Sequence, residues 1–91
     1  MPRIFKVGSY IIYFWVNKGN PTEPIHVHVS RVQSPNATKI WITSTRKCFL
    51  CNNNSKIPPV QLGIIMRALE ARVDDIIEMW KKIFGEVRFY C

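Results

Sequence analysis

The chain has 91 residues, of which 47% are hydrophobic and 21% are charged, and its formal net charge at neutral pH is +7. This length supports one hydrophobic core and excludes several domains, so we expect a single domain over residues 1–91. The longest apolar run, residues 10–16, falls far short of the roughly 20 residues that a membrane helix needs, so we expect no membrane partner.

The first segments of the chain are typical of a β-hairpin. Residues 3–7 are short and mixed, whereas residues 10–16 are rich in aromatic and β-branched side chains, which favours strands. Gly8 and Ser9 lie between the two segments and suit a tight turn. Residues 17–24 contain many turn-forming residues and are predicted to be a loop.

A second hairpin is predicted further along the chain. Residues 25–32 and 38–45 both alternate between apolar and polar side chains, and residues 33–36 supply the turn between them. Residues 48–51 are long enough for a short edge strand. We therefore expect a small antiparallel sheet of four or five strands within residues 1–56, as part of an α+β fold.

The second half changes to a helical period. The helical part is expected within residues 57–85. One unbroken helix over residues 59–84 would be about 39 Å long, too long for so small a domain, so we expect either one kinked helix or two helices. The break is predicted near residues 71–74, with Asp74 or Asp75 as the cap of the second segment. Residues 86–91 alternate and predict a final strand. The apolar stripe consists of Leu62, Ile65, Leu69, Val73, Ile76, Trp80 and Ile83.

The net charge is confined to one part of the sequence. Residues 1–60 carry eight basic residues and one acidic residue, which accounts for all of the +7, whereas residues 61–91 carry five of each sign. A one-sided basic field attracts phosphate polymers or acidic proteins. The alternative is that the excess basic residues only keep a small protein soluble.

Two histidines lie at the spacing that places them on one face of a strand. His26 and His28 are two residues apart, so they share a face, while Val27 points to the other. Lys39 and Trp41 match the histidine face on the pairing strand. Because two histidines can divide the roles of base and acid near neutral pH, they are candidate catalytic residues for metal-independent RNA cleavage. The plainer interpretation is an exposed polar strand surface that happens to carry two histidines.

Basic and aromatic residues of the first half are candidates for binding nucleic acid. Cations would balance the charge on a phosphate, and aromatic rings interleaved with them would stack on bases. The alternative for the aromatic residues is the hydrophobic core. The candidate nucleic-acid-binding residues are Arg31, Lys39, Trp41, Arg46 and Lys47.

The cysteines allow a different hypothesis, in which the protein binds zinc. Cys48 and Cys51 form a lone CxxC motif, which with His26 and His28 would complete a four-ligand set. The spacing opposes this hypothesis, because residues three apart in a strand point to opposite faces. We therefore predict neither a metal nor another cofactor, and we expect reduced thiols.

Two features predict a cytoplasmic protein. The first residues lack the apolar stretch of a signal peptide. The three cysteines are too few, and odd in number, for a disulfide framework, which fits a reducing compartment.

Several segments together resemble a known family. They are residues 1–5, residues 13–15, the stretch 23–29 that contains both histidines, residues 37–41, and the ending at residues 80–85. This combination resembles the bacterial domain-of-unknown-function family numbered 4160. The resemblance implies a toxin-like component that is encoded beside a second small protein of the family numbered 2442, which would be its antitoxin-like partner.

Three hypotheses follow for the function. The first is a ribonuclease-like toxin component that uses His26 and His28. The second is a non-enzymatic module whose basic sheet binds nucleic acid or an acidic protein. The third is a zinc-bound structural protein, and all three leave the oligomeric state open.

Overall fold

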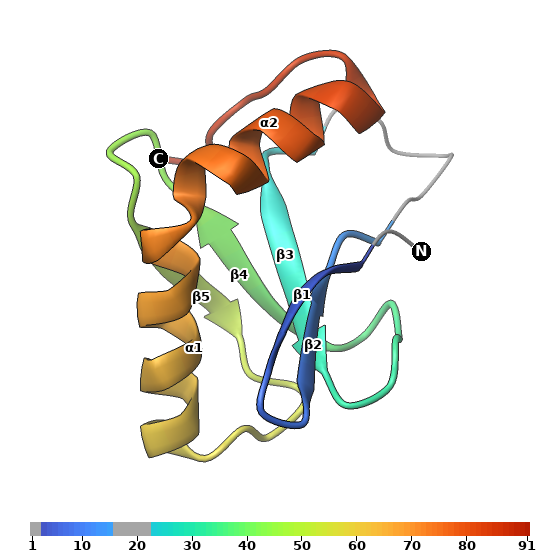
Figure 1. The fold of residues 1–91 in the computed structure, drawn as a ribbon, viewed down its shortest axis with the longest axis vertical. Helices are drawn as coiled ribbons and strands as arrows, with labels where there is room; N and C mark the ends of the chain where they lie inside the picture. Colours follow the sequence, from blue (N-terminus) through green and yellow to red (C-terminus); the bar gives the residue numbers. More distant parts are fainter. Residues whose placement is uncertain (1–2, 16–22) are drawn as a thin grey trace.

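The computed structural model describes residues 3–15 and 23–91 and shows an antiparallel sheet followed by two helices (Figure 1). This arrangement confirms the predicted α+β fold. The elements are β1 (Arg3–Val7), β2 (Tyr10–Tyr13), β3 (His26–Ser30), β4 (Thr38–Ile42), β5 (Cys48–Asn52), α1 (Pro59–Ala71) and α2 (Val73–Phe84). Neither helix of the described part is long and apolar enough to cross a membrane.

The five strands form one sheet in the order of the sequence, and every neighbouring pair is antiparallel. Gly8 has a positive φ of 59° at the β1–β2 turn, a conformation that glycine adopts without steric cost. The predicted loop over residues 17–24 lies between β2 and β3 in the sequence, and its residues 17–22 lie outside the described residues. β1 and β5 are the two edges of the sheet.

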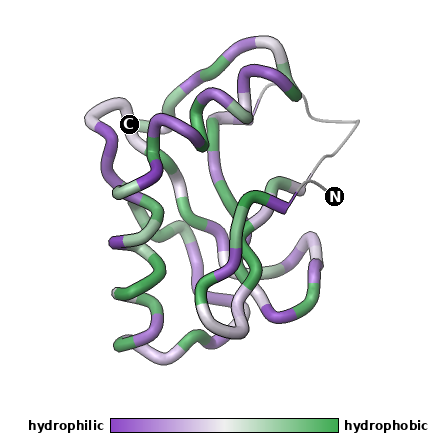
Figure 2. Tube along the Cα trace, viewed as in Figure 1, coloured by the Kyte–Doolittle hydropathy of each residue, from purple (hydrophilic) through white to green (hydrophobic). Residues whose placement is uncertain are grey.

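The hydrophobic core lies between one face of the sheet and the two helices. Apolar side chains from alternate positions of the central strands pack against the inner sides of α1 and α2, and hydrophobic and hydrophilic residues alternate along both helices (Figure 2). Their complete burial supplies most of the driving force for folding. The fully buried aliphatic residues of this core are Ile12, Ile25, Val27, Val29, Ile40, Ile42, Ile65, Leu69 and Ile76.

The predicted break divides the helical half into two helices, as expected. Arg72 lies between α1 and α2 with φ −120° and ψ 21°, outside helical geometry, and it is the N-cap of α2. The prediction that Asp74 or Asp75 caps α2 is wrong, because both lie in its first turn. There they still oppose the positive end of the helix dipole. Gly85 ends α2 with a positive φ of 88°.

The predicted final strand over residues 86–91 does not form. The segment has no regular secondary structure, although it lies beside the sheet and makes two backbone hydrogen bonds. The amide of Ile25 donates to the carbonyl of Arg88 over 2.9 Å, and that of Ser44 donates to Cys91 over 2.8 Å. Because Ile25 precedes β3 and Ser44 follows β4, neither donor lies in a strand, and the two bonds do not form a ladder with one strand.

Substitution of two adjacent isoleucines of α1 tests which side of this helix faces the core. Ile65 is completely buried, whereas Ile64 is 40% exposed. Ile65→Val should lower the free energy of unfolding by about 0.5–1.5 kcal/mol, because a buried methylene group is lost. The matched variant Ile64→Val should change it by less than about 0.5 kcal/mol. Urea unfolding followed by circular dichroism measures both, and equal losses would contradict this placement of α1.

Candidate functional site

The two histidines lie on the face of β3 opposite the helix-covered core, as their spacing predicted. His28 pairs with Lys39 of β4 and with Tyr13 of β2, while His26 pairs with Trp41 of β4. The hypothesis of an exposed strand surface is wrong, because the two histidines are only 4% and 6% exposed.

Each imidazole ring is held by a backbone carbonyl group. Nδ1 of His26 lies 2.8 Å from the carbonyl oxygen of Pro24, and Nδ1 of His28 lies 3.3 Å from that of Ala37. A carbonyl oxygen can only accept, so Nδ1 carries the proton in each ring and Nε2 keeps its lone pair.

The Nε2 atoms are the ring nitrogens that no backbone carbonyl holds. Neither Nε2 makes a hydrogen bond within the described residues. In the same part of the chain, no completely buried side-chain nitrogen or oxygen atom lacks a partner, so neither Nε2 is completely buried. Each Nε2 therefore keeps a lone pair that can accept a proton or a hydrogen bond.

Aromatic contacts further restrict the two rings. Their centroids lie 5.2 Å apart, and Tyr13 stacks on His28 at 5.8 Å. His26 makes edge contacts with Trp41 and with Trp80 of α2, both at 5.5 Å. Such contacts hold the imidazoles in one arrangement before any ligand arrives.

The two rings border a polar cleft of about 310 Å³, which we call the histidine cleft. Backbone and side chains from four parts of the chain meet there. Its lining residues are Trp15, Glu23, His26, His28, Pro35, Asn36, Ala37, Lys39, Asn52 and Asn54.

Lys39 supplies the positive charge of the histidine cleft. Its ammonium group forms an ion pair with Glu23 and lies 4.3 Å from the centre of the Trp41 ring. Burial raises the pKa of the Glu23 carboxyl, but the hydrogen bond from Lys39 and the nearby positive charges outweigh it, so this pKa lies below its usual value.

Both histidines are neutral at pH 7 in this environment. Burial lowers the pKa of His28 to about 4, and the positive charge of His26 and Lys39 acts in the same direction. Burial also lowers the pKa of His26, partly opposed by its hydrogen bond to Pro24. A neutral imidazole with a free Nε2 can act as a base but not as an acid.

The other candidate nucleic-acid-binding cations lie outside the histidine cleft. Arg46 and Lys47 are on the turn between β4 and β5, where they face acidic residues of the helices. Arg46 Nε lies 2.9 Å from the Asp74 carboxylate, and Lys47 lies 4.0 Å from Glu70. Arg31 follows β3 and its guanidinium group lies over the ring of Tyr10, at 5.3 Å.

Trp41 borders the site but has little free surface. It is 8% exposed, and Tyr90 of the C-terminal segment stacks on it at 4.7 Å with nearly parallel planes. The Lys39 ammonium group occupies a further part of the ring surface. Base stacking on Trp41 would therefore require Tyr90 to move away.

The structure does not assemble the four residues of the zinc hypothesis. Cys48 is half-buried against the core, where its thiol lies 3.7 Å from the carbonyl of Met66, whereas Cys51 is exposed. Burial and the charge of Glu70 raise the pKa of the Cys48 thiol to about 12, which opposes the thiolate that zinc needs. Among the described residues, no three histidine, cysteine or acidic side chains come together as a metal site.

Sequence reasoning missed several residues that line the histidine cleft. Glu23 is the single acidic residue of the basic half, and this isolation was a signal that it pairs with a cation. Asn36, Asn52 and Asn54 gave no such signal, because asparagine at these positions is also typical of turns.

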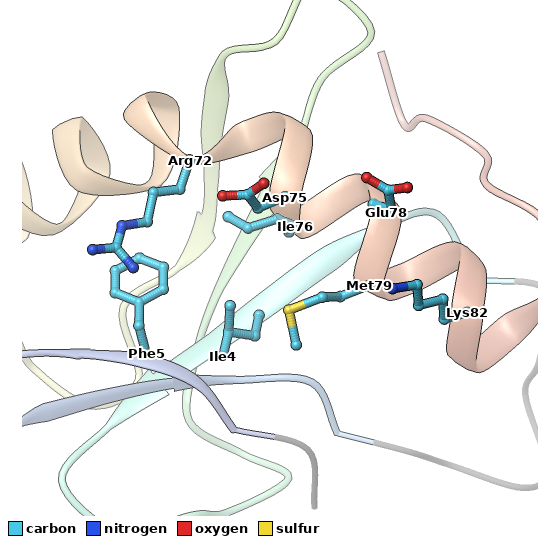
Figure 3. A pocket seen from close by; sticks show the side chains of 8 residues that line it. All are labelled: Ile4, Phe5, Arg72, Asp75, Ile76, Glu78, Met79 and Lys82. Carbon is cyan, nitrogen blue, oxygen red and sulfur yellow. The ribbon is translucent and has the colours of Figure 1, made fainter.

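A separate groove of about 340 Å³ lies between β1 and α2 (Figure 3). It has apolar residues below a rim that carries both signs of charge, a composition that does not favour phosphate. The guanidinium group of Arg72 lies over the ring of Phe5 at 4.6 Å, as Figure 3 shows. The lining residues are Ile4, Phe5, Arg72, Asp75, Ile76, Glu78, Met79 and Lys82.

The lowered pKa of His28 predicts a specific loss of stability in acid. The unfolded chain binds a proton on this ring near the ordinary pKa of about 6.5, whereas the folded protein does so only near 4. Stability should therefore be complete above pH 6.5 and fall progressively towards pH 4. Titration of the ring protons by NMR gives the pKa, and urea unfolding from pH 4 to 7 gives the stability. His28→Asn should show a shallower decrease, and an equally steep one would contradict this assignment.

The comparison with known proteins agrees with the resemblance seen in the sequence. No curated protein and no solved structure gives a match to the chain. A family model matches residues 9–81, which are more than half of the chain and include both histidines and Lys39. The chain therefore belongs to the DUF4160 family, whose description is a domain of unknown function.

Proposed function

We propose that the protein binds a phosphodiester of RNA in the histidine cleft and cleaves it without a metal. The observation that carries this proposal is that His26, His28 and the cation of Lys39 line the same cleft, with the Nε2 atom of each imidazole free of any hydrogen bond within the described residues. Two proton-transfer groups and one positive charge are what cleavage at a 2′-hydroxyl requires.

In the proposed reaction, one Nε2 accepts the proton of the 2′-hydroxyl as the 2′-oxygen forms a bond to phosphorus. The bond from phosphorus to the 5′-oxygen breaks, and this oxygen takes a proton from the other imidazole. The products are a 2′,3′-cyclic phosphate and a 5′-hydroxyl group. Lys39 would balance the negative charge on the non-bridging oxygens.

The protonated imidazole would be formed when the substrate binds. Burial leaves both rings neutral in the free protein. A phosphate within a few ångströms favours the charged form of a histidine and so raises its pKa. In the same step the phosphate would compete with Glu23 for the ammonium group of Lys39. We therefore expect the cleavage rate to be highest on the acid side of neutrality.

A second candidate function is binding without catalysis, to nucleic acid or to an acidic protein. It is favoured by the neutral state of both rings, which leaves the free protein without an imidazolium acid in the histidine cleft. The rigid aromatic surroundings would suit a preformed binding site equally well.

The toxin-like role, the antitoxin-like partner and the cytoplasmic location remain part of this proposal. They rest on the resemblance and on the composition of the chain. The basic excess of the first 60 residues supports an acidic partner or RNA.

An RNA cleavage assay with asparagine variants tests the proposal. His26→Asn and His28→Asn each keep a side-chain amide that can donate to the carbonyl of Pro24 or Ala37, but they remove Nε2. Each should lower the cleavage rate of an oligoribonucleotide about 10²- to 10⁴-fold. The variant Lys81→Gln, purified in the same way, should cleave as fast as the unmodified protein, which controls for contaminating nucleases.

A substrate with one 2′-deoxy nucleotide separates cleavage from binding. It should bind normally but remain uncut at that position, because the attacking hydroxyl group is missing. Cutting at that position at an unchanged rate would contradict the mechanism. Binding of RNA with no cleavage at any pH would favour the second candidate function.

A further inference from the structure

A second cavity with basic residues lies at the far end of β3 from His26. It has a volume of about 360 Å³ and is lined by two cations, three residues with hydroxyl groups and no acidic residue. We call it the Arg31 pocket. Its lining residues are Tyr10, Ser30, Arg31, Ser55, Lys56 and Pro58.

The two cations of the Arg31 pocket differ from the other candidate cations of the sheet. Lys39, Arg46 and Lys47 each lie beside a carboxylate. Within the described part of the chain, neither Arg31 nor Lys56 forms an ion pair, and both side chains are exposed. Their charge is therefore available to an external anion.

The surroundings of these two cations also favour an anion. Arg31 is supported by the ring of Tyr10, which leaves its guanidinium edge available for hydrogen bonds. The pocket includes Pro58, the N-cap of α1, and the first turn of this 13-residue helix contains no acidic residue. The positive end of the helix dipole adds to the charge of Arg31 and Lys56.

The Arg31 pocket and the histidine cleft are built from the same two segments. β3 and the residue after it contribute His26 and His28 to the cleft and Arg31 to the pocket. Arg31 lies just beyond the end of β3, and at about 3.3 Å per residue its Cα atom is about 10 Å from that of His28 along the strand direction. Its guanidinium group stacks on Tyr10 of the core, so the path from the histidine cleft to the Arg31 pocket passes around the end of the strand. The segment that follows β5 contributes Asn54 to the cleft and Lys56 to the pocket.

Buried hydrogen bonds fix the second segment against the sheet. The Thr38 hydroxyl donates to Asn53 Oδ1 over 2.8 Å and accepts from the Ser55 amide over 3.0 Å. The Ser55 hydroxyl donates to the carbonyl of Val29 over 2.9 Å. Because Thr38 is completely buried, these bonds hold the two cavities at a constant separation.

We propose that the Arg31 pocket binds a second phosphate of the same RNA strand whose reacting phosphodiester lies in the histidine cleft. The inference rests on the proposed function for its choice of ligand. Arg31 and Lys56 would neutralise the second phosphate, and the RNA strand would pass from the histidine cleft around the end of β3 to the Arg31 pocket. The pocket would thus strengthen binding of longer RNA without taking part in the reaction.

The test measures binding of two ligands that cannot be cleaved. One is a 2′-O-methyl dinucleoside monophosphate, which has a single phosphate and can occupy only one site. The other is a 2′-O-methyl hexanucleotide, which has five internucleotide phosphates and can reach both. Fluorescence anisotropy gives the affinity of the hexanucleotide at several salt concentrations, and competition gives that of the dinucleotide.

The variants remove one cation at a time. Arg31→Gln keeps a polar side chain. Lys56→Asn suits the positive φ of 56° at this position, which asparagine tolerates well. Lys81→Gln on α2 is the matched control, because Lys81 is also exposed and forms no ion pair within the described residues.

Arg31→Gln and Lys56→Asn should each weaken binding of the hexanucleotide several-fold. Each should reduce the slope of log affinity against log salt concentration by about 0.7, the value for one lost single-strand phosphate contact. Neither variant should change the affinity of the dinucleotide. Lys81→Gln should leave the affinity for both ligands unchanged.

The remaining outcomes separate this inference from the proposed function. If both variants bind the hexanucleotide more weakly but the unmodified protein never cuts RNA, the proposed cleavage is overturned and the phosphate-binding role of the Arg31 pocket is supported. Cleavage of RNA with unchanged hexanucleotide binding in both variants would overturn the Arg31 pocket alone. Equal losses for both ligands, or no hexanucleotide binding by the unmodified protein, would also overturn it.

Discussion

Burial of β3 on both of its faces is the constraint on which the rest of the structure depends. One face places Val27 and Val29 in the core beneath the helices, and the other places two imidazoles where almost no surface is exposed. A buried polar group must be hydrogen-bonded, since leaving it without a partner costs about 1–3 kcal/mol. The carbonyls of Pro24, before β3, and Ala37, in the loop between β3 and β4, satisfy this requirement, so the two hydrogen bonds fix the backbone at both places.

The same constraint joins the core to the candidate site. Trp80 of α2 contacts the ring of His26, and it also contacts Phe14 in the core at 5.2 Å. Tyr90 of the C-terminal segment covers Trp41, which in turn contacts His26. A domain of 91 residues has a small core, so the side chains around the candidate site also contribute to the packing of the fold. A substitution at either histidine therefore acts on stability as well as chemistry, and an asparagine that keeps the donor to the backbone separates the two effects better than alanine.

The sequence predicted the features that follow from the spacing of apolar and polar residues along one element. It did not predict the features that depend on which distant residues pack against a face of the sheet. Alternation in β3 predicted correctly that both histidines share a side, and the helix length predicted the break at Arg72. The burial of the histidines could not be read in the same way, because residues distant in sequence, such as Trp80, produce it. The tail at 86–91 alternates like a strand, but its two backbone bonds go to residues just outside β3 and β4 rather than to a strand.

The distribution of charge shows why a count along the sequence does not locate a binding surface. Counted by halves, all the net charge belongs to the first 60 residues. Folding brings acidic residues of the neutral second half to the β4–β5 turn, where Asp74 and Glu70 meet its two cations. These exposed pairs are weak, about 1 kcal/mol or less, yet a phosphate must still compete with a carboxylate at each of them. An anion meets no such competitor at Arg31 or Lys56 within the described residues, so these two cations at the end of β3 can bind it without displacing a carboxylate.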